Sequence, residues 1–266
     1  MAARVARISI APVKALGLVH PDEVELGPRG VEGNRRFWLV EADGRLVSNK
    51  QHRSLLKVRP EWDEQTRELA LTFPDGARVA GVVELGDEVF EQAMYGYGVK
   101  SRRVAGPWED ALSSYAGEPL TLLWAEEGAP DRLYAGTATL VARESVARLA
   151  EVAGEESIDP RRFRMTFDIE GVRPHEEDEW IETEVRIGDA TIKVHGDVGR
   201  CAITTLDPDS GEPTVDTLKA LASYRKDGRK EPLPLGVYAS VVVPGRVRVG
   251  DEVVPTQERL IATSLY

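Results

Sequence analysis

The sequence is organised around the segment Arg200-Cys201-Ala202-Ile203-Thr204-Thr205-Leu206-Asp207-Pro208-Asp209-Ser210-Gly211, which holds the only cysteine of the chain. An alternating run at residues 190–195 predicts a strand before it. The run 207–211 predicts a turn, because proline fixes φ, Asp and Ser bond back to the backbone, and glycine permits positive φ. Cys201 therefore lies near a strand end beside a guanidinium, which favours a thiolate that binds soft metals and attacks electrophiles. The alternative interpretation is that this lone cysteine is a small buried hydrophobe.

Composition limits the class of protein. The 266 residues are enough for one large or two modest domains, and a net charge of −11 argues against nucleic-acid binding. A single cysteine excludes internal disulfides, a cysteine-rich zinc site, and an iron–sulfur cluster ligated by this chain alone. No signal peptide and no apolar run of about 18 residues is evident, so we expect a soluble cytoplasmic protein with no membrane contact.

Short alternating segments separated by turn residues predict a mainly β fold with a few helices. Helices are expected at residues 107–115, stopped by Gly117, and at residues 143–153, ended by Gly154. A third helix is expected at residues 214–226, with Thr214 as its N-cap. Residues 126–136 are expected to form an irregular loop. The expected strands are residues 4–10, 24–26, 36–40, 46–48, 69–73, 77–79, 120–124, 165–169, 190–195, 236–243 and 246–254.

Two regions carry a family resemblance. The segment G-R-C-A-I-T-T-L-D-P-D-S-G, followed by Leu235-Gly236-Val237-Tyr238 and by residues 245–251, resembles the MOSC domain, named after the C-terminal domain of molybdenum cofactor sulfurases. Residues 10–14 and 30–40 resemble the N-terminal β-barrel domain that precedes MOSC. The resemblance implies a β-barrel-like domain at residues 1–117 packed on a MOSC β-barrel at residues 118–266, with parts that interpenetrate.

The resemblance also implies a site for the molybdenum cofactor. Cys201 would be the protein ligand to molybdenum, and hence the catalytic residue, or would carry sulfur. Anionic phosphate and pterin suit guanidinium and ammonium groups. The implied cofactor-binding residues are Lys14, Arg36, Ser145, Arg164, Thr166 and Arg200; Ser145 is equally interpretable as a first-turn helix serine.

The sequence departs from the family pattern in both halves. The family usually reads P-V-K-S, G-D-R-x-F and R-F-R-P-N. Here Ala15 replaces the serine, Arg35 the aspartate, and Met165 and Thr166 the last two residues of the third motif. Loss of the serine hydroxyl removes one expected donor, and threonine offers a hydroxyl where asparagine offers an amide.

Other polar segments have simpler interpretations. Residues 175–180 are interpreted as a solvated acidic loop rather than a metal site, because runs of like charge usually lie exposed. His195 is interpreted either as a strand histidine with a hydrogen-bond partner or as a residue that supports the site residues without contacting the ligand. The basic loop at residues 225–234 is expected to be solvated or to act as a lid. Gly96 and Gly98 lack the strand–turn–helix context of a dinucleotide site.

Three functional hypotheses follow. The first is an oxidoreductase resembling the amidoxime-reducing MOSC proteins, which reduces N-hydroxylated or N-oxide small molecules with electrons from a separate protein. The second is a carrier that holds or delivers the cofactor without catalysis. The third is a sulfur carrier with a Cys201 persulfide, which needs a separate desulfurase because no pyridoxal-phosphate module fits in this length.

Overall fold

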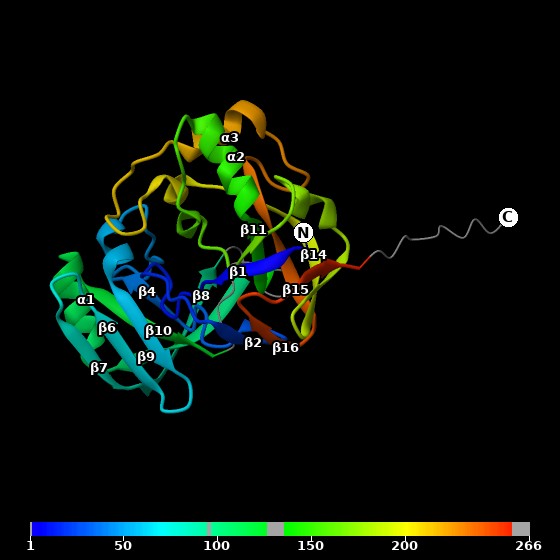
Figure 1. The fold of residues 1–266 in the computed structure, drawn as a ribbon. Helices are drawn as coiled ribbons and strands as arrows, with labels where there is room; N and C mark the ends of the chain where they lie inside the picture. The colour runs from blue at the N-terminus through cyan, green and yellow to red at the C-terminus, as the bar shows by residue number, and fades with distance from the viewer. Residues whose placement is uncertain (1, 95–96, 127–135, 257–266) are drawn as a thin grey trace.

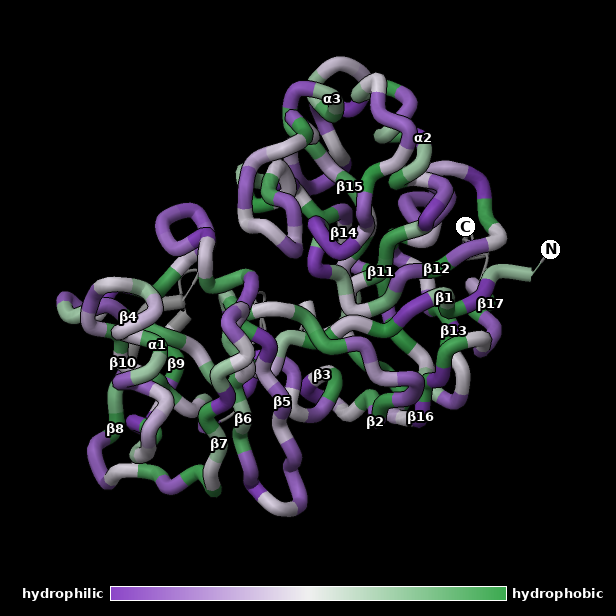
Figure 2. The backbone as a smooth tube through the Cα atoms, turned by 60° about the vertical axis from the view of Figure 1, so that its left-hand side comes forward, coloured by the Kyte–Doolittle hydropathy of each residue, from purple (hydrophilic) through white to green (hydrophobic). Residues whose placement is uncertain are grey.

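The computed structural model describes residues 2–94, 97–126 and 136–256, which form two units side by side (Figure 1). Both units are built mostly from strands, as the sequence predicts. Along the backbone, apolar and polar residues alternate over short distances, as expected for strands with one face in a core (Figure 2).

A nearly closed barrel forms the larger unit. Its seven strands follow the order β1 (Arg4–Ile8), β12 (Phe167–Glu170), β11 (Ala138–Ala142), β15 (Pro234–Val243), β14 (Ala190–Gly199), β13 (Glu184–Ile187) and β17 (Val253–Pro255). Only β11 and β12 pair in parallel. A bridge between Arg4 and Glu252 brings the first and last strands together, so neither is left as a free sheet edge there.

Two further layers complete this unit. The sheet of β16 (Gly245–Arg248), β2 (Glu23–Gly27) and β3 (Gly30–Val31) adds Val24, Leu26 and Val247 to the barrel core. The helices α2 (Arg143–Ala153) and α3 (Thr217–Tyr224) share a second core with Phe163. Short 3-10 helices lie at Pro160–Phe163 (η3), Glu176–Trp180 (η4) and Ala202–Thr205 (η5).

In the part that the structure describes, the smaller unit contains two sheets, one α-helix and one 3-10 helix. One sheet has the order β4 (Phe37–Glu41), β10 (Leu120–Ala125), β9 (Tyr97–Ala105) and β8 (Glu84–Met94); the other joins β5 (Arg59–Asp63), β6 (Glu68–Thr72) and β7 (Arg78–Val82). Helix α1 (Trp108–Ala116) ends at Gly117 in the left-handed conformation, as predicted. The buried Trp108 ring ties α1 to β6, because its Nε1–H donates to the Leu69 carbonyl at 3.1 Å. The 3-10 helix η1 (Arg53–Lys57) precedes β5.

The chain crosses between the units more than twice, because residues 13–16 join the core of the smaller unit between β1 and β2 of the larger unit, and β4 to β10 return to the smaller unit. The N-terminal strand β1 belongs to the barrel, whereas β10 belongs to the sheet of the smaller unit. The division at residues 117 and 118 stays a prediction.

Several local predictions need correction. Thr214 does not cap α3: the helix begins at Thr217, and the side chain of Asp216 accepts the Lys219 N–H at 3.0 Å. The Thr214 hydroxyl instead accepts a hydrogen bond from Arg162 at 2.5 Å. Residues 46–48 form only an isolated bridge from Leu46 to Val40, not a strand.

The sequence predictions omit one hairpin, and one predicted loop lies mostly outside the described residues. The hairpin of β8 and β9 was not predicted, because β8 is rich in acidic residues and mostly exposed, so it shows no apolar alternation. Most of the predicted loop at residues 126–136 lies outside the described residues. Within the described part of the chain, no helix is long and apolar enough to cross a membrane.

Candidate functional site

Cys201 lies just beyond the end of β14 with its thiol side exposed. Its backbone is extended, and it caps η5: the Cys201 carbonyl accepts the Thr204 N–H at 3.1 Å and the Thr204 hydroxyl at 3.0 Å. The interpretation as a buried hydrophobe is therefore wrong. Cys201 is thus accessible to solvent at the end of β14, and the hydrogen bonds of its carbonyl to Thr204 connect it to η5.

A cavity of about 680 Å³ opens in front of this cysteine, between the two units. We call it the Cys201 cavity. Among the described residues that line it, every charged side chain is a cation: Lys14, Arg35, Lys50, Arg162, Arg164 and Arg200. The fold thus brings together four of the predicted site residues, Lys14, Arg164, Arg200 and Cys201, in an otherwise acidic protein.

The smaller-unit wall depends on a short parallel pairing. The Lys14 N–H donates to the Phe37 carbonyl at 2.8 Å, and the Arg35 N–H donates to the Ala11 carbonyl at 2.7 Å. Ala15 and Arg35 both adopt positive φ, 75° and 54°. The Asn49 amide donates to the Ala15 carbonyl at 2.5 Å, which fixes the turn beside the cavity.

Arg164 joins the two walls. It ends η3 in the left-handed conformation, and its guanidinium donates to the Leu16 carbonyl of the smaller unit at 2.8 Å. One cation therefore faces the cavity and bridges both units.

Arg200 mainly supports the strand end. Its guanidinium donates to the carbonyls of Leu235 and Phe163 at 2.9 and 3.1 Å. Burial lowers the pKa of Arg200, and the neighbouring Cys201 sulfur opposes that change. The guanidinium thus lies next to the cysteine while its donors hold β15 and η3.

Three predicted site residues lie elsewhere. Arg36 and Thr166 line a separate cavity of about 440 Å³, where the Arg36 guanidinium stacks 3.9 Å from the centre of the Trp124 ring. Ser145 is fully buried, and its hydroxyl donates to Glu177 Oε2 at 2.9 Å. None of the three is among the residues that line the Cys201 cavity. Their assignment to the cofactor stays a prediction.

The acidic run at residues 175–180 is not simply a solvated loop. Glu177 is 0% exposed, and its carboxylate also accepts the Ala142 N–H at 3.2 Å. Burial raises the pKa of Glu177 to about 7. Asp178 pairs with Arg225 at 2.5 Å, which anchors the start of the basic loop. His195, by contrast, is a strand histidine with a partner, the Ser240 hydroxyl at 2.7 Å.

The basic loop at residues 225–234 is held by a buried carboxylate. Asp197, 2% exposed, accepts the N–H groups of Arg229, Lys230 and Glu231 at 2.6 to 3.0 Å. The side chains of Lys226, Arg229 and Lys230 are exposed, as the solvated interpretation expects, while the backbone of the loop is anchored by Asp197.

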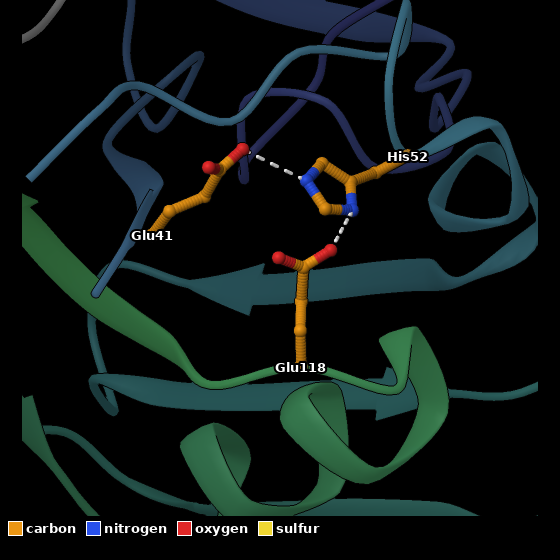
Figure 3. A group of neighbouring side chains, drawn as sticks. All are labelled: Glu41, His52 and Glu118. Atoms are coloured by element: carbon orange, nitrogen blue, oxygen red, sulfur yellow. Dashed lines mark hydrogen bonds and ion pairs between the residues drawn. The ribbon is translucent and has the colours of Figure 1, made fainter. Parts of the chain in front are cut away.

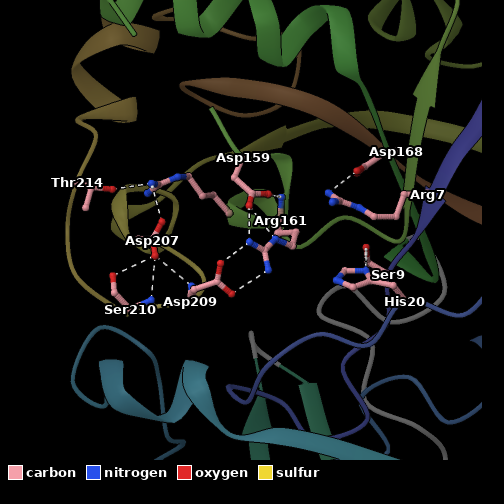
Figure 4. Close-up of polar contacts among 11 residues, drawn as sticks. Arg7, Ser9, His20, Asp159, Arg161, Asp168, Asp207, Asp209, Ser210 and Thr214 are labelled. Carbon is pink, nitrogen blue, oxygen red and sulfur yellow. Dashed lines mark hydrogen bonds and ion pairs between the residues drawn. The ribbon is translucent and has the colours of Figure 1, made fainter. Parts of the chain in front are cut away.

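The turn after Cys201 and the helix η3 form one polar network (Figure 4). Asp207 Oδ1 accepts hydrogen bonds from the N–H and hydroxyl of Ser210 at 2.9 and 3.0 Å, which confirms the predicted turn. Arg161 binds Asp209 through two parallel hydrogen bonds of 3.0 and 2.6 Å. The network fixes the segment that carries Arg164 against the segment that carries Cys201.

A second cluster lies behind the cavity wall, where His52 sits between two carboxylates (Figure 3). Its Nε2 is 3.0 Å from Glu41 Oε1, and its Nδ1 is 3.2 Å from Glu118 Oε1. The three groups are close enough to suggest a metal site. However, the carboxylates face different ring nitrogens, and Arg45 already pairs with Glu41 at 2.5 Å. The arrangement fits a histidine bridge that anchors residues 46–50 of the cavity wall.

Sequence reasoning missed Arg35, Asn49 and Lys50 as cavity residues. In the sequence, Arg35 stands out only as a departure from the family pattern. Arg35, which adopts positive φ, lines both the Cys201 cavity and the cavity of Arg36 and Thr166, whereas Arg36 lines only the latter of these two. A periodic pattern cannot reveal such a conformation, because a non-glycine residue rarely adopts it.

Comparisons with known proteins cover both units. A family model of the MOSC domain matches residues 135–254, and a model of the MOSC N-terminal beta barrel domain matches residues 2–107. The Homo sapiens protein named mitochondrial amidoxime-reducing component 1 is 27% identical, over 94% of this chain and 82% of that protein. The Bos taurus protein named mitochondrial amidoxime reducing component 2 is 25% identical, over 94% and 82%. The Anopheles gambiae molybdenum cofactor sulfurase is 24% identical, over 90% of this chain and 34% of that protein.

Proposed function

The chain belongs to the MOSC domain family and carries the MOSC N-terminal β-barrel domain, and from this membership we propose that it binds the molybdenum cofactor in the Cys201 cavity. The observation that carries the proposal is the composition of that cavity: Cys201 is exposed, and every charged residue among the described residues that line the cavity with it is a cation. Molybdenum supplies oxygen-atom transfer chemistry when the cofactor is bound.

The residues present fit this cofactor. Its phosphate and pterin dithiolene are anionic, so guanidinium and ammonium groups are suitable partners. A cavity of about 680 Å³ falls within the usual size range for small-molecule sites. The soft sulfur of Cys201 suits a metal that already has sulfur ligands.

Each cavity residue has a distinct role in the proposal. Lys14, Arg35 and Arg164 bind the anionic parts of the cofactor. Arg200 holds the strand end next to Cys201, the proposed metal ligand. Arg164 also keeps the two walls in register through Leu16.

The proposed reaction is reduction of an N-hydroxylated or N-oxide small molecule. For a hydroxamic acid, the N–O bond breaks: R–CO–NH–OH with two electrons and two protons gives R–CO–NH₂ and water. The electrons come from a separate donor protein. The relatives named for amidoxime reduction support this reaction class.

Two alternatives use the same site. A carrier would hold the cofactor without turnover. A sulfur carrier would use a Cys201 persulfide supplied by a separate desulfurase; the exposed thiol and the similarity to a molybdenum cofactor sulfurase support this alternative. A cytoplasmic location also belongs to the proposal, although relatives are named mitochondrial, and cell fractionation tests it.

One assay separates the three functions. Protein from a cofactor-producing host is given a hydroxylamine or amidoxime and a chemically reduced viologen as electron source, and the reduced product is quantified. Product formation that is lost in Cys201→Ala supports the enzyme. Bound cofactor without product supports the carrier, and a cyanide-labile sulfur without molybdenum supports the persulfide.

A further inference from the structure

A second large cavity adjoins the Cys201 cavity. Its volume is about 760 Å³, and it shares Arg162, Arg164 and Ile203 with the Cys201 cavity. We call it the outer cavity. The two cavities are therefore neighbours, with Arg164 in the wall between them.

The outer cavity is lined by both apolar residues and cationic side chains. Its apolar lining includes Leu56, Phe73 and Leu206. Its charged lining residues are Lys57, Arg59, Arg161, Arg162, Arg164 and Asp209. Asp209 is the only acid among the described residues that line it, and Arg161 neutralises it through the two-bond pair.

Two of these cations, Lys57 and Arg59, differ from Arg162 in having no ion-pair partner among the described residues. Arg162 donates to the Thr205 carbonyl at 3.0 Å and to Thr214, so its donors hold the fold. Lys57 is half-buried and Arg59 exposed, and neither forms an ion pair with any described residue. In a protein with a net charge of −11, two unneutralised cations beside an apolar wall are suited to an anion with an apolar body.

A close backbone contact holds the segment that carries Lys57 at the outer cavity. The Gly17 N–H donates to the Val58 carbonyl at 2.8 Å. A Cβ at Gly17 would lie 2.9 Å from that same oxygen, so only glycine allows the approach. Helix η1, which carries Lys57, therefore packs directly against the segment at residues 16–19 that completes the cavity wall.

We propose that the outer cavity is a substrate subsite that binds the anionic group of an organic acid, with Lys57 and Arg59 facing the charge. The inference rests on the proposed function and specifies its substrate class: N-oxygenated compounds that carry a carboxylate on an apolar body. In this arrangement the N–O group faces the cofactor held at Cys201, the apolar body passes Arg164, and the carboxylate reaches Lys57 and Arg59.

Binding of the amide products tests the subsite without any turnover. The probes are benzamides with a para carboxylate, attached directly or through a two-carbon spacer, and their methyl esters as neutral controls. Their dissociation constants are measured by titration calorimetry on cofactor-loaded protein. Lys57→Gln/Arg59→Gln removes both charges; Arg53→Gln/Arg78→Gln is the matched control, because it removes two exposed cations of η1 and β7 outside the cavity.

We expect a carboxylated amide to bind wild-type protein more tightly than its ester. Lys57→Gln/Arg59→Gln should weaken that binding about tenfold, as expected for two partly exposed charge pairs, and should leave ester binding unchanged. The control variant should behave as wild type. Equal binding of acid and ester, or equal loss in both double variants, would overturn the subsite.

Turnover of the matching hydroxamic acids is a separate measurement. In Lys57→Gln/Arg59→Gln, KM for the carboxylated hydroxamic acid should rise about tenfold with kcat unchanged, because uniform binding is lost. If the protein binds the acids as predicted but reduces nothing, the proposed reaction fails while the anion subsite is supported. If it reduces neutral and carboxylated compounds with equal KM, the subsite is contradicted while the reaction is supported.

Discussion

Replacing Glu177 by glutamine should stabilise the protein at alkaline pH but not at acidic pH. The carboxyl is fully buried in η4, where it accepts hydrogen bonds from the Ser145 hydroxyl and the Ala142 N–H. Burial raises its pKa from 4.5 to about 7, because removal from water disfavours the charged form. Glutamine has the shape of the protonated carboxyl and cannot ionise.

The sign of the pH dependence follows from that change. The folded state holds the Glu177 proton more tightly than the unfolded state. Its contribution to stability is therefore complete below pH 4.5 and declines as the pH rises to about 7. At about 1.4 kcal/mol per pKa unit, the decline amounts to roughly 3 kcal/mol at pH 8. For a chain of this size, that corresponds to a difference in Tm of roughly 6 to 12 °C.

The assay is thermal and urea unfolding of wild type and Glu177→Gln at pH 5 and pH 8. We expect similar stability at pH 5 and a clear advantage of the variant at pH 8. Glu179→Gln is the control, because Glu179 lies in the same 3-10 helix with its side chain 60% exposed. If Glu177→Gln is the less stable protein at pH 8, or if its difference from wild type does not change with pH, the reasoning is wrong.

Gly106→Ala should cost about 2 to 4 kcal/mol of unfolding free energy, because Gly106 has φ +148° and a Cβ would lie 2.2 Å from the Trp108 ring; urea unfolding measures it, and a loss below about 1 kcal/mol would contradict the geometry. His52→Gln should raise the pKa of Glu41, since the His52 hydrogen bond is the largest cause of its lowered value; side-chain NMR titration detects this, and an unchanged titration would refute the bridge. Arg164→Ala should reduce the amount of bound cofactor several-fold, as measured by pterin fluorescence. The control is Arg148→Ala, because Arg148 is an exposed arginine of α2. Equal cofactor retention in the two variants would show that Arg164 does not bind the cofactor.

Local signals in the sequence were sufficient for most elements. Gly117 and Gly154 end α1 and α2 where they were predicted, because both adopt the left-handed conformation that glycine favours at a helix end. The mainly β class also followed from alternation and turn residues. The N-cap of α3 did not, because a tertiary contact with Arg162 engages Thr214 and leaves Asp216 to cap the helix.

The site was only partly predictable. Lys14, Arg164, Arg200 and Cys201 line one cavity, and their roles toward the cofactor stay predictions. The position of Arg35 depends on a positive φ, and that of Lys50 on a loop anchored by His52. The sequence does not single out Glu177 as the buried member of its acidic run, because a one-dimensional pattern cannot show which residue of the run faces the core. Such features depend on tertiary contacts rather than on local propensity.

Molybdenum and pterin content tests the central claim most directly. The protein is purified from a host that makes the cofactor, and molybdenum and fluorescent oxidised pterin are measured per chain, with Cys201→Ala in parallel. The account predicts near-stoichiometric amounts of both in wild type, and molybdenum that is reduced in amount or electronically altered in the variant. Absence of both molybdenum and pterin, from a host shown to load a related protein, would contradict the account and leave persulfide chemistry or a structural cysteine.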